Sequence, residues 1–435
     1  FGSTLLYYNE RPAISRNQIG TEPARNFQYG VDFNINKKSR LLTKIIDALP
    51  IIQTKEQSTI VASGEFAQLL PGTSNKIDGE GTAYLDDFEN SATPYSLINA
   101  NAWKLAAPPT KDDRFDKTLG QQNNIEAGYL RSKLAWYTID NQFYRSASRF
   151  KPDNITEADL QNHYVRGVNP QEIFQNRQNY QGVFFEQIFD VAYYPRERGP
   201  YNYNTELDED GLFDIEKAEE KWGGITSAIR TEVDFDKANI EYVEFWLLDP
   251  FITTDKGLID DGINTPKHAT AGKLIFQLGS ISEDVARDGQ HAFENGLPPN
   301  GDSTAANRTN WGYVTNQQYL TNSFDDNSGA RANQDVGHDG MPDEKEVAFF
   351  NESYLDGLNP DAKAIVINDP SGDDFRYFLD SQYDDDEAQL LERYKNINGH
   401  DGNSPIITGS DVATPSGTSI PDNEDLNADN TLSEL

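Results

Sequence analysis

The sequence predicts a mainly β protein in which short strands are separated by long acidic loops. Some segments, such as residues 58–70, alternate between apolar and polar side chains, and this period of two is typical of half-buried strands. Aromatic residues make up 11% of the chain, too many for a disordered protein, although the hydrophobic content is only 36%. The length of 435 residues predicts two or three folded units rather than a single core.

The first segment, residues 1–75, is expected to be β-structure. Residues 4–8 begin one strand and residues 58–70 form another, while residues 39–49 between them predict a short helix. Alternating segments of about ten residues fit the strands of a β-sandwich and the strands of a membrane barrel equally well. The pattern alone therefore leaves both folds open.

The second segment, residues 76–300, is expected to contain a β-sandwich. At 83–89 apolar residues run into paired acids, which is typical of the start of a carbohydrate-binding-like sandwich domain. Helices are expected over residues 156–164 and 214–222, and a strand over residues 183–194.

Two further strands are expected to supply the core of this sandwich. Residues 240–248 are apolar on both faces, as in an inner strand, and residues 273–279 alternate more regularly. We therefore expect Trp246 to be buried, and Phe276 to point inward on a strand of the same domain.

The third segment, residues 301–435, is expected to be acidic, rich in loops and partly helical. Residues 325–435 hold 26 acidic and six basic side chains, a net charge of −20. Helices are expected over residues 344–354 and 386–396, because acidic residues open the first turn and basic residues close the last turn of the second one.

The composition excludes several classes of function. A net charge of −34 repels phosphate backbones, so we expect no nucleic-acid partner and divalent cations as the natural counter-ions. The absence of cysteine excludes thiolate metal sites, disulfides and a cysteine nucleophile. No run of 18 apolar residues predicts a transmembrane helix.

No motif in the chain predicts catalysis. The five histidines are scattered, and His338 is expected to be a solvated loop residue rather than a metal ligand. No nucleotide-binding or serine-hydrolase signature occurs. The acid pairs Asp86/Asp87 and Asp373/Asp374 are of the kind that a glycosidase uses, but in so acidic a chain adjacent carboxylates are expected to face solvent. We therefore expect the protein not to be an enzyme.

An oxygen-rich loop near the end of the chain predicts a calcium site. Asp425, Asn427 and Asp429 alternate, and Thr431 can offer its backbone carbonyl. The bidentate acid of an EF-hand-type loop would fall beyond the last residue, so we expect the chain to be a piece of a larger protein. A similar segment at 208–214 is expected to be only a turn.

A second candidate calcium loop carries four acids at short spacing. Asp335, Asp339, Asp343 and Glu346 offer carboxylates, and Gly340 permits the sharp turn that such a loop needs. The alternative stays open, because aspartate and glycine also form simple turns and acids also begin helices.

An ordered set of motifs resembles one known family. The motifs span most of the chain and occur in the expected order, which makes the set more specific than any single member. They are GTAYLDDFE at 81–89, LAWY at 134–137, AYYPRERGPYN at 192–202, NIEYVEFWLLDPF at 239–251, GSISED at 279–284, FENGLP at 293–298, QDVGHDG at 334–340, DPSGDDF at 369–375, GNSP at 402–405 and PDNEDLN at 421–427. Together they resemble the SprA (Sov) family, the outer-membrane translocon of the type IX secretion system in gliding Bacteroidetes.

The resemblance implies a fold. Members of the family form a very large single-chain outer-membrane β-barrel with soluble insertions between strands. Residues 1–75 would then contribute barrel strands and a connecting segment. Residues 76–300 would form an inserted galactose-binding-like (jelly-roll) β-sandwich, followed by the acidic loops of residues 301–435.

The resemblance also implies a function without chemistry in this chain. Folded cargo would pass through the lumen to the cell surface and support gliding motility. The implied partners are a PorV-type outer-membrane shuttle protein, a plug protein and secreted cargo with a type IX C-terminal signal. We expect the insert to face the cell exterior, with the periplasm as the alternative.

A rival interpretation from another class is a secreted, calcium-stabilised carbohydrate-binding or adhesin module. Aromatic pairs near turns, at 136–137 and 193–194, would suit a sugar-binding surface. Such pairs are more often packed in a sandwich core. Strands of residues 1–75 that face lipid would favour the translocon, and a sugar-binding groove would favour the adhesin.

Overall fold

The computed structural model describes most of the chain. The described residues are 1–10, 24–50, 56–72, 95–109, 112–115, 118, 120–145, 151–177, 185–230, 234–237, 240–250, 253–254, 257–258, 272–316, 322–327, 329–399 and 420–433. The chain divides into two compact units. Unit 1 comprises Phe1–Pro94, Asn169–Glu186 and Asp234–Trp246, and unit 2 comprises Tyr95–Val168, Gln187–Val233 and Leu247–Leu435.

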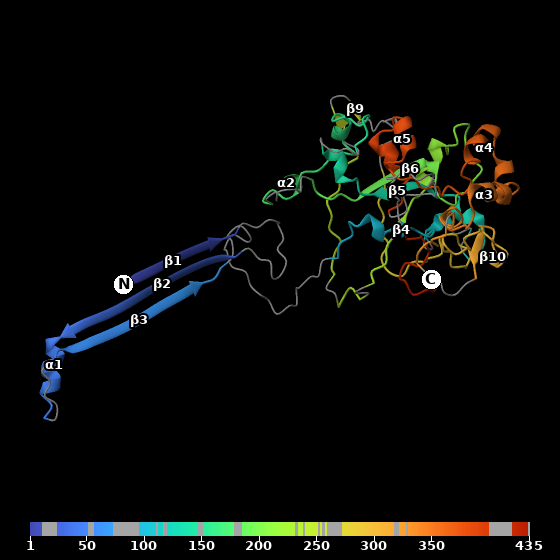
Figure 1. The fold of residues 1–435 in the computed structure, drawn as a ribbon. Helices are drawn as coiled ribbons and strands as arrows, with labels where there is room; N and C mark the ends of the chain where they lie inside the picture. Colours follow the sequence, from blue (N-terminus) through green and yellow to red (C-terminus); the bar gives the residue numbers. More distant parts are fainter. Residues whose placement is uncertain are drawn as a thin grey trace. The chain divides into compact units, whose positions relative to one another are not determined.

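Unit 1 is built on a three-stranded antiparallel sheet (Figure 1). Its strands are β1 (Gly2–Asn9), β2 (Arg25–Ser39) and β3 (Ser58–Leu70), with β2 in the middle. The helix α1 (Arg40–Asp47) joins β2 to β3, and the side chain of Ser39 caps its first turn by accepting the N–H of Leu42. The two predicted strands and the short helix between them are confirmed.

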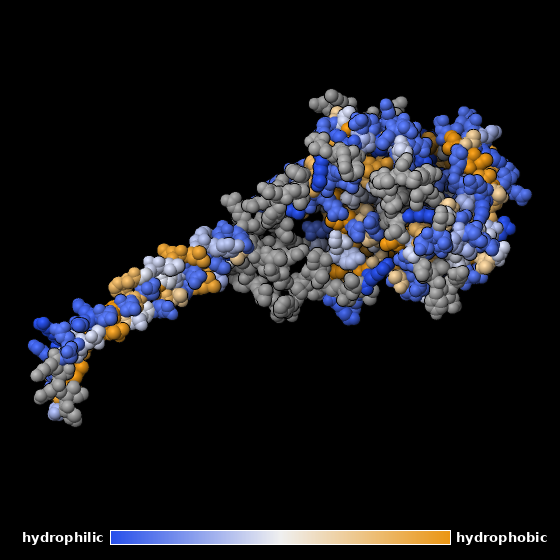
Figure 2. Space-filling view, in the orientation of Figure 1, coloured by the Kyte–Doolittle hydropathy of each residue, from blue (hydrophilic) through white to orange (hydrophobic). Residues whose placement is uncertain are grey.

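The middle strand gives this sheet one apolar face. Phe27, Tyr29, Val31, Phe33 and Ile35 alternate with polar residues along β2, so they share one side of the sheet. The cross-strand register adds to this side the apolar residues Leu5, Tyr7, Ile60, Phe66 and Leu70. We call these ten residues the apolar sheet face, and Figure 2 shows apolar side chains along the sheet.

The apolar sheet face is not covered by other described parts of the chain. Val31, at its centre, is 49% exposed, and Phe66, its neighbour across β3, is 57% exposed. Exposed apolar surface on this scale marks an interaction site for a partner or a membrane.

Unit 2 holds the hydrophobic core of the protein and has little regular structure. Its longest strand pair joins β5 (Ser132–Tyr137) to β6 (Asp190–Arg198) in antiparallel fashion. The other described strands are β4 (Lys104–Leu105), β7 (Ile225–Thr226), β8 (Thr253–Thr254), β9 (Gly257–Leu258), β10 (Ala306–Arg308) and β11 (Tyr313–Thr315). They form two-stranded sheets that pair β4 with β7, β8 with β9 and β10 with β11.

The helices are short. The α-helices that follow α1 are α2 (Pro170–Ile173) in unit 1 and, in unit 2, α3 (Asp343–Phe350), α4 (Pro360–Val366), α5 (Ser381–Asp385) and α6 (Leu390–Tyr394). The 3-10 helices are Ala100–Ala102, Asp113–Phe115, Ile125–Gly128, Asn141–Tyr144, Asp159–Gln161, Ile215–Glu220, Arg331–Asn333 and Leu355–Gly357. Among the helices described, none has the length and hydropathy that crossing a bilayer requires.

Aromatic side chains fill the main core of unit 2. Tyr203 and Phe350 are fully buried, and their rings stack with centroids 4.3 Å apart. Trp136 from β5 belongs to the same cluster, and its backbone N–H donates to the carbonyl of Ile397 at 3.2 Å. Lys104 ties the C-terminal segment 420–433 to this unit, because its Nζ donates to the carbonyl and the side chain of Asn423, at 2.7 and 2.8 Å.

The prediction that residues 240–248 and 273–279 are strands of a sandwich core is wrong. Residues 240–248 and 273–279 are irregular and exposed: Trp246 is 73% and Phe276 51% exposed. Both segments are rich in apolar residues, as a strand requires. A strand also needs a neighbouring strand for its backbone hydrogen bonds, however, and none of the described residues supplies one. A jelly-roll sandwich is therefore not visible in the described residues, where the sheets are small and antiparallel and helices are as common as strands.

Several predicted elements are shorter or displaced. The helices predicted over 156–164 and 214–222 are the 3-10 helices Asp159–Gln161 and Ile215–Glu220. The helix predicted over 344–354 is α3, and the one predicted over 386–396 is α6. The strand predicted over 183–194 is β6, whose predicted first residues lie, like residues 83–89, outside the described residues. The predicted divisions at 75/76 and 300/301 stay predictions.

Candidate metal centre

Three buried carboxylates meet in unit 2. Asp339 lies in the turn before α3, Glu346 in the first part of α3, and Asp373 in the turn after α4. One carboxylate oxygen of each lies within 4.8 Å of the others, and the three side chains are all buried. We call this group the acidic triad. Three hard oxygen donors at this spacing can hold a metal ion.

Glycines bring the backbone of the first loop close to the triad. Gly337 and Gly340 have positive φ angles of 74° and 69°, a conformation that other residues adopt only under strain. A Cβ on Gly337 would lie 1.9 Å from Oδ2 of Asp373. The loop can therefore pass this close to Asp373 only because residue 337 has no side chain, and the predicted sharp turn at Gly340 is confirmed.

Hydrogen bonds from one residue hold two members of the triad. The hydroxyl of Ser371 donates to Oδ2 of Asp339 at 2.5 Å, and its backbone N–H donates to Oε2 of Glu346 at 2.8 Å. The backbone N–H of Met341 donates to Oδ1 of Asp339 at 2.8 Å. Oδ2 of Asp373, in contrast, is buried without a hydrogen-bond partner.

Burial raises the pKa of each carboxyl in the triad. The pKa of Asp339 rises to about 8 and that of Glu346 to about 10, chiefly because burial disfavours the charged form. The pKa of Asp373 is raised well above its ordinary value by burial first and then by the negative charges of Asp339 and Glu346. Asp369 adds to the repulsion at all three groups.

Arg198, a half-buried cation that interacts electrostatically with Glu346, is engaged elsewhere. Arg198 donates through its guanidinium to the backbone carbonyls of Asn202, Asp369 and Pro370. Within the described part of the chain, no ion pair reaches any carboxylate of the triad. The negative charge of the triad is therefore not neutralised by a direct basic partner there.

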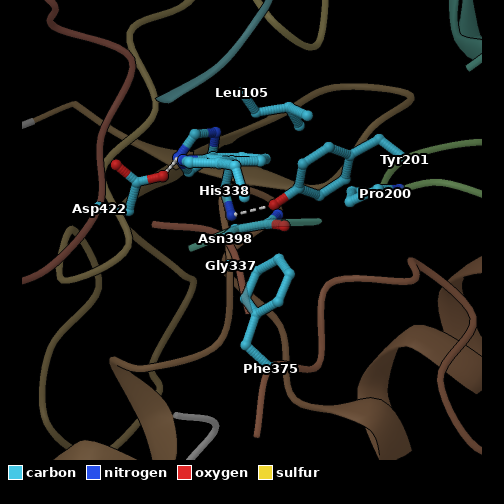
Figure 3. Close-up of a pocket in the computed structure, with 9 residues that line it drawn as sticks. Leu105, Pro200, Tyr201, Gly337, His338, Phe375, Asn398 and Asp422 are labelled. Atoms are coloured by element: carbon cyan, nitrogen blue, oxygen red, sulfur yellow. Dashed lines mark hydrogen bonds and ion pairs between the residues drawn. The ribbon is translucent and has the colours of Figure 1, made fainter. Parts of the chain in front are cut away.

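A small pocket beside the triad is lined by Tyr201, His338 and Asp422 (Figure 3). Nε2 of His338 lies 3.2 Å from Oδ2 of Asp422, and the backbone N–H of His338 donates to the hydroxyl of Tyr201 at 2.8 Å. The rings of Tyr201 and His338 stack with centroids 5.9 Å apart. The prediction that His338 is a solvated loop histidine is wrong, because its side chain packs in this interior contact.

The second predicted calcium loop supplies two members of the triad. Asp339 and Glu346 belong to it, whereas Asp335 forms an ion pair with Arg331 at 2.6 Å. Asp343 lies in the first turn of α3 and is not part of the group.

The sequence analysis did not identify Asp373, the third member of the acidic triad. Asp373 and Asp374 were expected to face solvent as a pair, but Asp373 is only 7% exposed, while Asp374 is exposed. A turn residue 34 positions after Asp339 shows its proximity only in the fold. The signal in the sequence was the turn Pro370-Ser371-Gly372, which places an acid at its end.

The terminal loop has a different arrangement. The carboxylate of Asp425 accepts the backbone N–H groups of Ala428, Asp429 and Asn430, at 2.6, 3.2 and 2.9 Å. The side chain of Asn427 accepts the N–H of Asp429, and that of Asp429 accepts the N–H of Thr431. These oxygens hold the turn itself, and a calcium ion at Asp425, Asn427, Asp429 and Thr431 stays a prediction.

Two other expectations concern turns and aromatic pairs. At 208–214, Oδ1 of Asp208 accepts the N–H groups of Asp210 and Leu212, so the predicted turn is confirmed. Trp136 and Tyr137 are buried in the core, which confirms that this pair packs inside rather than forming a sugar-binding platform.

Comparison with known protein families finds a match in the C-terminal part of the chain. A domain of motility- or secretion-related proteins is recognised at residues 350–435, which begin at the end of α3 and include Asp373. The matching family is SprA_N, described as "Motility related/secretion protein", and the chain is similar to it over these residues. No curated protein matches the chain.

Proposed function

We propose that the chain is a structural part of the outer-membrane protein-conducting channel of the type IX secretion system. The channel passes folded cargo to the cell surface and supports gliding motility. The SprA-family domain supports the secretion role. The observation that carries the membrane role is the apolar sheet face of unit 1, together with the polar residues of β2 that alternate with it on the opposite side.

The dimensions of the sheet suit a membrane barrel. A transmembrane β-strand needs about 9–11 residues, and β2 and β3 have 15 and 13. In such barrels apolar side chains that face lipid alternate with polar ones that face the lumen. On β2, Val31 would face lipid and Asp32, the next residue, would face the lumen.

The chain contributes no chemistry in this proposal. A folded client passes through a lumen, and partner proteins open and close the path. The partners are a PorV-type shuttle protein that collects cargo, a plug protein, and cargo with a type IX C-terminal signal. Unit 2 is the acidic insert, and it faces the cell exterior because outer-membrane barrels carry their longer loops on that side.

Cysteine labelling tests the orientation of the sheet, because the chain has no cysteine of its own. The variants are Val31→Cys and Asp32→Cys in the protein in native outer membranes, each labelled with a polarity-sensitive dye. At residue 31 we expect blue-shifted emission that is quenched by nitroxide lipids. At residue 32 we expect red-shifted emission that is quenched by aqueous iodide. Equal aqueous quenching at both positions would contradict the membrane assignment.

The secretion role needs a separate measurement in cells. Val31→Asp places a charge on the apolar sheet face, whereas the matched change Asn34→Asp places one on the polar face. We expect Val31→Asp to abolish release of type IX cargo and gliding, and Asn34→Asp to preserve both. If neither variant affects cargo release, the sheet is not part of the conducting channel.

The side of the membrane on which unit 2 lies can be tested by proteolysis. A protease site is inserted at Gly329, which has open space around its Cα. Cleavage by protease added to intact cells is the expected result. Protection that disappears only when the outer membrane is opened would show that unit 2 is periplasmic.

A further inference from the structure

We propose that the acidic triad of Asp339, Glu346 and Asp373 is a calcium site that fastens three segments of unit 2 together. The triad joins the turn before α3, the helix α3 and the turn after α4. This proposal does not depend on the secretion function, since it rests only on the geometry of unit 2.

The first argument is the unpartnered carboxylate oxygen. Asp373 is 7% exposed, and its Oδ2 has no hydrogen-bond partner although it belongs to the triad. A buried polar atom without a partner costs stability, and proteins rarely tolerate it unless something else satisfies the atom. Its place beside two more carboxylates calls for a positive ligand and not for a further acceptor.

The second argument is charge. If they are ionised together, three carboxylates within 4.8 Å of one another repel strongly in the protein interior. Arg198, which interacts electrostatically with Glu346, donates instead to backbone carbonyls. A divalent cation neutralises most of this charge and lets the three groups stay ionised together.

The third argument is the size and chemistry of the site. Calcium binds oxygens at about 2.3–2.6 Å, so two ligands on opposite sides of one ion lie up to roughly 5 Å apart. The separation of 4.8 Å or less within the triad fits this span. The donors are all carboxylates, which favours calcium, magnesium or manganese over zinc or copper. Three carboxylates offer six oxygens, and calcium accepts the flexible, bidentate geometries that this set allows.

Calcium titration of the full 435-residue chain tests the proposal. The chain is stripped with chelator and unfolded thermally at increasing calcium concentrations, up to several times the roughly 1 mM at which extracellular sites are filled. We expect a rise in Tm with calcium and a smaller rise with equal magnesium. No rise with calcium would overturn the site, and an equal rise with magnesium would overturn its selectivity.

Two isosteric variants distinguish calcium binding at the acidic triad from diffuse calcium binding to surface carboxylates. Asp373→Asn removes a ligand, and Asp374→Asn makes the same chemical change at the exposed neighbour. We expect Asp373→Asn to weaken calcium affinity at least about tenfold, as loss of even an outer-shell partner does. Asp374→Asn should leave the affinity unchanged. Equal losses in both variants would show that calcium binds diffusely to surface acids.

Comparing the melting temperatures of the variant and the wild type, in chelator and in calcium, distinguishes loss of calcium binding from misfolding of the variant. In chelator, Asp373→Asn should melt at or above the temperature of the wild type, because it removes one of three crowded, buried carboxyl groups. In saturating calcium the order should reverse. A variant that melts below the wild type by the same interval in both conditions would show that Asp373 has a structural role without calcium, and would refute the proposal.

Discussion

The carboxylate of Glu424 accepts the backbone N–H of Ala292 at 2.8 Å, joining segments that lie 132 positions apart. The same carboxylate also accepts the N–H groups of Val285 and Ala286, at 2.8 and 3.2 Å. Glu424 is 1% exposed, so a single buried side chain satisfies three backbone donors of a loop that has no regular structure. Side chains here replace the backbone ladder of a sheet.

Removing the Glu424 carboxylate is expected to destabilise unit 2 strongly. Glu424→Ala leaves three buried N–H groups without acceptors and should cost about 3–5 kcal/mol. Glu424→Gln keeps one acceptor and should cost less. Urea unfolding followed by tryptophan fluorescence measures both, with Glu352→Ala at an exposed position as the control. An effect of Glu424→Ala as small as that of the control would show that the three bonds do not support the fold.

Two phenylalanines in unit 2 test the corrected core. Phe350→Ala removes a fully buried ring stacked on Tyr203 and should cost about 3–5 kcal/mol. Phe276→Ala makes the same change at a ring that is 51% exposed, and should stay within about 1 kcal/mol. Equal and large losses at both sites would restore the predicted buried strand at residues 273–279.

Alanine variants of Gly340 and Gly120 distinguish the cost of backbone strain from the cost of steric conflict. Both have positive φ angles, but a Cβ at Gly340 would lie 2.5 Å from the carbonyl oxygen of Tyr313, whereas nothing lies within 4 Å at Gly120. Gly120→Ala should cost about 1–2 kcal/mol for the conformation alone. Gly340→Ala should cost at least about 1–3 kcal/mol more, because the neighbouring backbone must move. Equal costs from chemical denaturation would mean that the loop at Gly340 yields freely.

Asp190 predicts a pH dependence of stability. Burial raises its pKa to about 7, while a backbone hydrogen bond from Ile139 partly opposes this. The folded state therefore holds the proton more tightly than the unfolded state does. The contribution of Asp190 to stability should be most favourable below about pH 4, fall between pH 4 and 7, and remain lower above pH 7.

The variant Asp190→Asn removes that dependence. We expect its Tm at pH 8 to exceed that of the wild type by about 2–6 °C, and the difference to vanish near pH 4. Asp153→Asn, at an exposed position, serves as the control for the change of residue type. A difference between Asp190→Asn and the wild type that does not vary with pH would contradict the raised pKa of Asp190.

Local features of the fold could be predicted from the sequence, whereas the pairing of segments far apart in the chain could not. The alternation of β3 and the short helix that follows Ser39 are local, and both appear in the structure at the expected residues. Residues 240–248 have an equally strong apolar pattern, yet pairing depends on segments far away in the chain. Periodicity states what a segment can bury and does not state what will cover it.

The acidic triad illustrates the same limit at the level of a site. Asp339 and Glu346 lie seven positions apart on one loop and helix, so the spacing of acids in the sequence pointed to both. Asp373 joins them only because the turn after α4 returns to the start of α3. The pattern of Asp, Gly and Asp residues identified the loop, and the fold selected which oxygens converge.

The bond from Lys104 to Asn423 has a consequence for timing, because the two residues are 319 positions apart. Ribosomes add about 5–20 residues each second, so Lys104 waits roughly 15–60 s for its partner to be synthesised. Unit 2 cannot close in that interval, and loops of such length close slowly and at an entropic cost. The contact between Lys104 and Asn423 can therefore form only after nearly all of unit 2 has been synthesised.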